Sequence, residues 1–209
     1  MYAPKRYQET ERDNIIEFME AHPFATLISQ AEGKSYATQI PVILEEREGV
    51  LYLQGHVSVH TDHYPALEQN NDVLLLFTGA HCYVSASWYA ERGQASTWNY
   101  MTVQARGTLR MFDYDGSLEL LKTLTHHYED GQVAPELVEN MPEDYVTANV
   151  KAIRGFEIAV SSLDATFKLS QNKTDESYIN AVKHLMETDD IDSISIAGEM
   201  IRRRPHLFE

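Results

Sequence analysis

Short apolar blocks separated by polar turns predict a chain rich in β-strands. Three blocks early in the chain show this pattern: residues 24–30, 35–44 and 50–54. Because the turns between them are short and carry glycine, they predict an antiparallel meander. Pro41 has no N–H group to donate, so we expect it at an edge, at a bulge or at the end of its strand.

Later apolar blocks predict the rest of the sheet: residues 72–77, 82–85, 98–112 and 153–161. The run at 72–77 is continuously apolar, which predicts a central strand buried on both faces. Residues 86–96 predict an exposed loop with Gly93 at its apex, and residues 167–172 predict an extended segment.

A helical spacing of apolar residues recurs between and after these strands. The predicted helices span residues 10–21, 61–69, 114–128, 143–150, 174–187 and 190–203. Strands in hairpins, with inserted and appended helices, predict an α+β fold around an antiparallel barrel. We expect one domain over residues 1–209, with a helical C-terminal extension over about 174–209. The sequence has no glycine-rich strand-to-helix turn, which argues against a Rossmann or P-loop nucleotide site.

The formal net charge of −15 argues against some classes of partner. An acidic surface repels phosphate backbones and anionic lipids, so direct nucleic-acid binding and membrane association are not expected. The sequence has no apolar run as long as a membrane span, and its N-terminal residues lack the apolar core of a signal peptide. The single cysteine, Cys82, excludes an internal disulfide and fits a buried side chain in a reducing cytoplasm. We therefore expect a cytoplasmic protein.

The stretch 84–100 concentrates aromatic and hydroxyl side chains. It holds both tryptophans, Trp88 and Trp98, each next to a tyrosine, with serine and threonine residues between them. Aromatic planes beside hydroxyl groups suit a flat, partly polar ligand, but large rings in a core hairpin would give the same pattern. Composition alone leaves both interpretations open.

Seven blocks along the chain form a recognisable series. They are Met1–Pro4, Phe24–Leu27, Ala37–Pro41, Leu53–His56, Tyr83–Tyr89, Ser96–Tyr100 and Lys168–Asn172. In this order and spacing they resemble the FMN-binding negative transcriptional regulator family (PaiB-type). The resemblance implies a split β-barrel of the flavin-reductase type and a homodimer with FMN bound at the subunit interface. The chain departs from the family where Ala86 and Ser96 replace prolines, so we expect a more mobile loop. It also lacks an arginine in the turn after His56, so we expect weaker phosphate binding in that turn.

The resemblance implies one group of cofactor contacts at the end of the third strand and in the turn that follows it. This group consists of His56, Val57, Ser58, His60 and Thr61. They flank the start of a helix, where backbone N–H groups attract a phosphate; the alternative is that the histidines are surface polar residues. His56, His60 and His63 could instead suggest a metal site, but no cysteine or carboxylate cluster accompanies them, so no metal is predicted.

Three further groups are expected to contact the cofactor: Thr38, Gln39 and Ile40; Thr97, Trp98 and Asn99; and Lys168, Ser170 and Gln171. Alternation along a strand places Thr97 and Asn99 on one face and Trp98 on the other. One subunit therefore cannot present all three to one ligand unless the strand bulges or a dimer wraps around it. Lys168 can bind phosphate or stabilise a reduced flavin, and a solvated lysine beside a helix cap is the alternative.

These predictions favour a cytoplasmic homodimer that binds FMN and acts as a flavin-dependent oxidoreductase. No catalytic acid or base is predicted, which is compatible with an enzyme because a flavin carries the redox chemistry itself. The alternatives are a non-enzymatic regulator that senses flavin or acts through protein partners, and a haem-binding relative on the same barrel.

Overall fold

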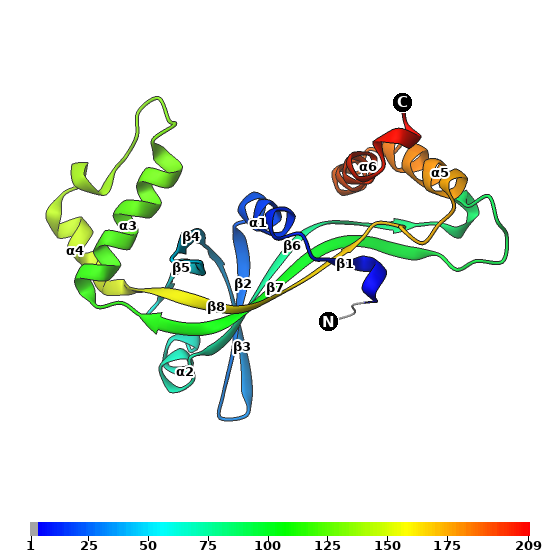
Figure 1. Ribbon diagram of the computed structural model, residues 1–209. Helices are drawn as coiled ribbons and strands as arrows, with labels where there is room; N and C mark the ends of the chain where they lie inside the picture. Colours follow the sequence, from blue (N-terminus) through cyan, green and yellow to red (C-terminus); the bar gives the residue numbers. More distant parts are fainter. Residues whose placement is uncertain (1–3) are drawn as a thin grey trace. The chain divides into compact units, whose positions relative to one another are not determined.

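The structure is a computed structural model that describes residues 4–209, so Met1, Tyr2 and Ala3 of the N-terminal motif lie outside the described residues. The chain divides into two compact units. Unit 1 comprises the described residues up to 19 together with residues 78–103 and 164–209, and unit 2 comprises residues 20–77 and 104–163. Figure 1 labels the helices and strands of both units.

One antiparallel sheet supplies strands to both units. Its strand order is β3-β2-β6-β7-β8-β5-β4, and β1 pairs with β8. The strands span Gln8–Glu9 (β1), Phe24–Ala31 (β2), Lys34–Pro41 (β3), Ile43–Arg47 (β4), Val50–Ser58 (β5), Asp72–Val84 (β6), Thr97–Met111 (β7) and Ile153–Lys168 (β8). With the helices below, this sheet confirms the predicted α+β class.

All six predicted helices are present. They span Arg12–Ala21 (α1), His63–Gln69 (α2), Tyr114–Glu129 (α3), Glu143–Ala152 (α4), Asp175–Met186 (α5) and Ile191–Arg203 (α6). Single 3-10 turns occur at Lys5–Tyr7, Ala86–Trp88, Val138–Asn140 and Pro205–Leu207. Within residues 4–209, every helix is too short or too polar to cross a membrane.

Two hairpins in unit 2 replace the predicted meander. β2 pairs with β3, and β4 pairs with β5. Their turns, Glu32-Gly33 and Glu48-Gly49, have positive φ at both residues, which is the geometry of a two-residue hairpin. The prediction of one strand over 35–44 was wrong because Pro41 cannot continue the ladder. β3 ends at Pro41, and β4 begins at Ile43 at the opposite end of the sheet order.

The apolar run at 72–77 forms a central part of the sheet, but its burial differs from the prediction. Val73, Leu75 and Phe77 are buried, whereas Leu74 and Leu76 are half-buried. The prediction of a strand buried on both faces was therefore wrong: only one face lies in the core of unit 2. The strand also continues without a break through the second predicted block, to Val84.

Two glycines permit close packing within unit 2. A Cβ at Gly107 would lie 2.3 Å from the carbonyl oxygen of Ala159, so only glycine allows β7 and β8 to approach this closely. A Cβ at Gly55 would lie 3.0 Å from the carbonyl oxygen of Pro41. β3 and β5 stand apart in the sheet order, yet they pack together at this point. This contact curls the sheet of unit 2 toward a barrel.

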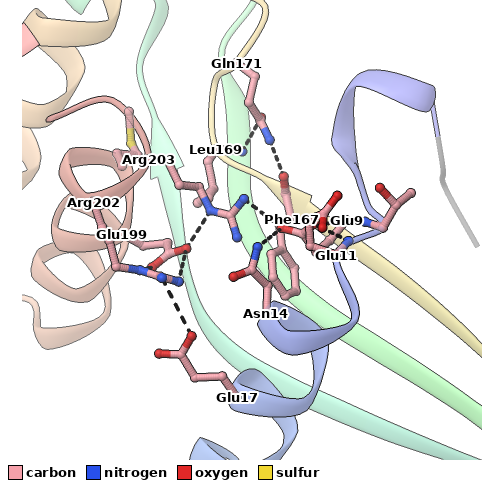
Figure 2. Close-up of polar contacts among 12 residues, drawn as sticks. Glu9, Glu11, Asn14, Glu17, Phe167, Leu169, Gln171, Glu199, Arg202 and Arg203 are labelled. Atoms are coloured by element: carbon pink, nitrogen blue, oxygen red, sulfur yellow. Dashed lines mark hydrogen bonds and ion pairs between the residues drawn. The ribbon is translucent and has the colours of Figure 1, made fainter. Parts of the chain in front are cut away.

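In unit 1, α5 and α6 pack on each other (Figure 1), and an ion pair joins α6 to the N-terminal strand β1. The Tyr178 hydroxyl on α5 donates a hydrogen bond of 2.9 Å to the Met200 carbonyl oxygen on α6. Figure 2 shows Arg203 between two carboxylates, with Nη1 2.8 Å from Glu9 and Nε 2.6 Å from Glu199. Arg203, at the end of the last helix, therefore forms one ion pair with β1 and one within its own helix.

Candidate functional site

The predicted site residues occur in both units. Unit 2 contains Thr38, Gln39, Ile40, His56, Val57, Ser58, His60 and Thr61, and unit 1 contains Thr97, Trp98, Asn99, Lys168, Ser170 and Gln171. The side chains of Ile40 and Val57 are buried in the core of unit 2, so only their backbone groups can meet a ligand. The side chain of Gln39 is exposed, as its alternation with Ile40 along β3 requires.

Thr38 forms a hydrogen bond with the buried His63, whose sequence context suggested only a metal site. His63 lies with Nδ1 2.8 Å from the Thr38 hydroxyl and Nε2 2.9 Å from the Ser29 hydroxyl. Burial lowers the pKa of His63, with Asp62 acting weakly in the opposite direction. Both ring nitrogens are occupied, so His63 connects β2, β3 and α2 and has a structural role. Residues 4–209 contain no group of three side chains arranged to hold a metal ion.

The turn after β5 satisfies much of its own hydrogen-bonding capacity. The Ser58 hydroxyl accepts the His60 N–H at 3.2 Å, and the Ser58 carbonyl oxygen accepts the Thr61 N–H at 3.4 Å and the Thr61 hydroxyl at 3.0 Å. The helix that follows, α2, has only seven residues. The turn therefore brings Ser58, His60 and Thr61 together but offers few open donors to a phosphate.

His56 has a different environment. Its side chain is half-buried, and Nδ1 is a buried atom without a hydrogen-bond partner among the described residues. Burial lowers the pKa of His56, which favours the neutral imidazole. An unsatisfied buried polar atom costs about 1–3 kcal/mol, so Nδ1 is a position where a ligand or an ordered water stabilises the protein.

In unit 1, β7 shows the alternation predicted for residues 97–99. Asn99 is buried and exchanges hydrogen bonds of 3.0 and 3.2 Å with the Ser170 hydroxyl. The side chain of Trp98 points the opposite way and is 54% exposed. Its ring centroid lies 6.0 Å from those of both His81 and Tyr83, so the three rings form an open aromatic surface.

The segment after β8 folds back on itself. The Gln171 side chain accepts the Leu169 N–H at 2.7 Å and donates to the Phe167 carbonyl oxygen. Ser170 adopts φ 60°, and its carbonyl oxygen accepts the Lys173 N–H at 3.0 Å. Ser170 and Gln171, which were expected to contact the cofactor, therefore shape this turn.

Lys168 faces a cavity of about 380 Å³ in unit 1. The residues that line it are Tyr7, Gln94, Ala95, Ser96, Thr97, Lys168, Ser170, Asn172 and Lys173. Lys168 donates to the Thr97 hydroxyl. Burial lowers the pKa of Lys168 and the charge of Lys173 lowers it further, while burial lowers the pKa of Lys173 against the opposing charge of Glu91. Sequence reasoning missed Lys173, although its position five residues after Lys168 was a usable signal.

A larger cavity, of about 800 Å³, lies in unit 2 and involves none of the predicted site residues. Its walls include Pro23, Val42, Gln54, Phe112 and Leu120, which come from several separate segments. No local motif joins these residues, so the sequence carried no signal for this cavity.

Comparison with known proteins places the chain in a family. A family model described as "Putative FMN-binding domain" matches residues 1–162. "Protease synthase and sporulation protein PAI 2" of Bacillus subtilis is 30% identical over 200 residues, which cover 96% of each chain.

Solved structures share the fold. The flavocytochrome of Azotobacter vinelandii matches with a TM-score of 0.56 at 16% identity, over 78% of this chain and 69% of that chain. The FAD and haem binding protein of Mycobacterium smegmatis matches with a TM-score of 0.57 at 18% identity, over 83% of this chain and 79% of that chain. These matches confirm the predicted split-barrel fold, and the family model gives FMN as the cofactor. The chain belongs to the FMN-binding domain family, which confirms the PaiB-type resemblance carried by its motifs.

Proposed function

We propose that the protein is a cytoplasmic homodimer that binds FMN and uses it as a flavin-dependent oxidoreductase. The residues proposed to contact the cofactor are Thr38–Ile40, His56–Thr61, Thr97–Asn99 and Lys168. Ser170 and Gln171 act by shaping the turn that follows Lys168. When bound, FMN supplies the redox chemistry, and these residues bind and orient it.

The observation that carries this proposal is the unsatisfied Nδ1 of His56. It is buried, it lies within the span matched by the family model, and it can exchange a hydrogen bond with a polar edge of the isoalloxazine ring. The neutral imidazole favoured by burial can donate or accept, depending on its tautomer. The exposed Trp98 surface supports the proposal, because an open indole face suits stacking on a planar ring.

Replacing His56 by phenylalanine separates a ligand role from a structural one. We expect His56→Phe to weaken FMN binding about tenfold, because it removes the hydrogen bond to the ring. The cofactor-free variant should be at least as stable as the natural protein, since an unsatisfied buried atom is removed. FMN fluorescence titration and thermal unfolding measure the two effects. His127→Phe, at an exposed position on α3, is the matched control.

A loss of stability with unchanged FMN affinity in His56→Phe would contradict the proposed site. Light scattering during gel filtration, with and without FMN, tests the homodimer. Oxidation of NAD(P)H by the flavin-loaded protein tests the oxidoreductase activity.

The second candidate is a regulator that senses flavin without turning over a substrate. The observation that favours it is the Bacillus subtilis relative, which is named for protease synthesis and sporulation. An FMN-loaded dimer that consumes no NAD(P)H, but binds a protein partner in a flavin-dependent way, would support this candidate over the enzyme. The net charge of −15 favours a protein partner over nucleic acid.

A further inference from the structure

The cavity of unit 1 is lined by two lysine side chains, although the protein as a whole is strongly acidic. The whole chain has 32 acidic and 17 basic residues, yet none of the described residues that line this cavity is an aspartate or a glutamate. Two of the lining residues are lysines, and most of the others carry hydroxyl or amide groups. This composition is that of an anion site.

The backbone brings the two lysines together. Lys168 ends β8, and the turn closed by the Lys173 N–H and the Ser170 carbonyl oxygen returns the chain to the same cavity. Ser170 has a φ of 60° in this turn, a backbone conformation that residues other than glycine seldom adopt. The hydrogen bonds between its hydroxyl and the buried Asn99 fix it there. The pairing of the lysines is thus imposed by a rigid turn.

Both ammonium groups are held in position by neighbouring side chains. Lys168 donates to Thr97 and lies 5.8 Å from the ring centroid of Tyr7. Lys173 donates to Gln94 and lies 3.8 Å from the ring centroid of Tyr89. Burial and the charge of Lys173 lower the pKa of Lys168, so a bound anion would relieve an existing repulsion.

We propose that this cavity binds the phosphate group of a phosphorylated small molecule, with Lys168 and Lys173 as the two cations. A phosphate monoester carries a charge of about −1.5 to −2 at pH 7, which matches two ammonium groups, whereas a single carboxylate neutralises only one. The volume of about 380 Å³ exceeds that of a phosphate group and lies in the range of small-molecule sites. The phosphate belongs either to FMN itself or to a separate ligand, and the proposal does not require that the protein binds flavin.

Calorimetric titration of the full-length protein with inorganic phosphate tests the site directly. We expect saturable binding that Lys168→Gln and Lys173→Gln each weaken about tenfold, because each removes a charged hydrogen-bond donor. Lys183→Gln is the control: it makes the same charge change on α5 in unit 1, at an exposed position outside the cavity. Its affinity for phosphate should equal that of the natural protein.

A further variant keeps the test informative if a lysine variant misfolds. Ser96 is exposed on the cavity wall, and its hydroxyl accepts the Ala86 N–H, an acceptor role that aspartate can retain. Ser96→Asp adds a negative charge to the cavity and should abolish phosphate binding. Circular dichroism confirms the folding of each variant.

Titrating FMN-saturated protein identifies the source of the phosphate. If FMN abolishes phosphate binding, and Lys173→Gln weakens FMN but not riboflavin, the group is that of the cofactor. If phosphate still binds to FMN-saturated protein, the ligand is a separate phosphorylated molecule. Absence of saturable binding at millimolar phosphate, or equal affinities in Lys173→Gln and Lys183→Gln, would overturn the proposal. Riboflavin binding reports on the flavin site independently, so the failure of one proposal is distinguishable from the failure of the other.

Discussion

Among the described residues, each unit contains an ion cluster of three side chains, and the central charges of the two clusters are opposite in sign. In unit 2, the Glu157 carboxylate on β8 accepts hydrogen bonds from two arginines, with Arg110 at 2.7 Å and Arg47 as the second donor. In unit 1, the Arg203 guanidinium lies between two carboxylates, Glu9 and Glu199. Each cluster therefore has one central charge and two partners of the other sign.

The clusters differ in how far water reaches the partners. The side chains of Arg47 and Arg110 are 42% and 67% exposed, whereas those of Glu9 and Glu199 are 6% and 11% exposed. If the central residue is lost, the arginines of unit 2 are already open to water, whereas in unit 1 Glu199 keeps its ion pair with Arg202 and Glu9 is left nearly buried without a cation. The exposure of the partners should therefore decide the cost of breaking each cluster.

The cluster of unit 1 also bears on the proposed phosphate site. Glu9 belongs to β1, which pairs with β8 through Glu9↔Ala165. Tyr7, just before β1, lines the phosphate cavity and donates a hydrogen bond of 2.9 Å to Asn172, which also lines it. Arg203 thus helps to position one wall of the cavity from the last helix.

Removing Arg203 should have the largest effect. We expect Arg203→Met to lower the free energy of unfolding by about 3–5 kcal/mol, because it leaves the nearly buried Glu9 carboxylate without its cation, whereas Glu199 keeps its ion pair with Arg202. Urea denaturation measures the change. Arg202→Met is the matched control on the same helix: its side chain is 52% exposed, so its ion pairs should contribute no more than about 1 kcal/mol. Equal losses in the two variants would contradict the importance of burial.

Glu157→Gln should cost less, about 1–2 kcal/mol. The amide keeps one acceptor oxygen for the arginines, and both guanidinium groups have access to water. The same urea assay applies. A loss larger than that of Arg203→Met would show that the central charge, and not the exposure of its partners, determines the cost.

Sequence patterns predicted the elements of the fold far better than the partners of individual side chains. Alternation placed Thr97 and Asn99 opposite Trp98, and helical spacing predicted the helix over 174–187 that forms α5. Such features depend on near neighbours in the chain. The split of the first strands at Pro41 was missed because the sequence shows that proline interrupts a ladder but not where the chain goes next.

The site was predictable only in part for the same reason. Lys168 and Asn99 were identified through motifs, and the structure gives them contacts with Thr97 and Ser170, each 71 residues away in the chain. The pairing of Glu9 with Arg203 joins the two ends of the chain. Neither periodicity nor spacing encodes such contacts, which form only when the sheet and the last helices assemble.

Acid should reduce the stability deficit of both variants, which is the loss in unfolding free energy relative to the natural protein. The pH range of this reduction should differ between Arg203→Met and Glu157→Gln. Burial raises the pKa of Glu9, but hydrogen bonds from Glu11 and Arg203 lower it by more than burial raises it. Burial also raises the pKa of Glu157, but Arg110 and Arg47 lower it by more than burial raises it. Both pKa values therefore lie below the ordinary 4.5, so each group stabilises the protein above pH 4.5 and loses this contribution as the pH falls through its lowered pKa. Glutamine does not titrate, so the deficit of Glu157→Gln should shrink only below pH 4.5.

In Arg203→Met the pKa of Glu9 should rise, because burial then acts without the opposing cation. The Glu9 carboxylate of this variant takes up a proton at a higher pH than in the natural protein, so the stability loss should shrink over a pH range shifted upward from that of the natural Glu9. Unfolding free energies of the two variants and the natural protein, measured from about pH 7 to about pH 3, give both curves. If the two variants lose their stability deficits over the same pH range, Glu9 gains access to water once Arg203 is gone. The difference between the two clusters would then depend on the mobility of the residues around the central charge and not on their burial.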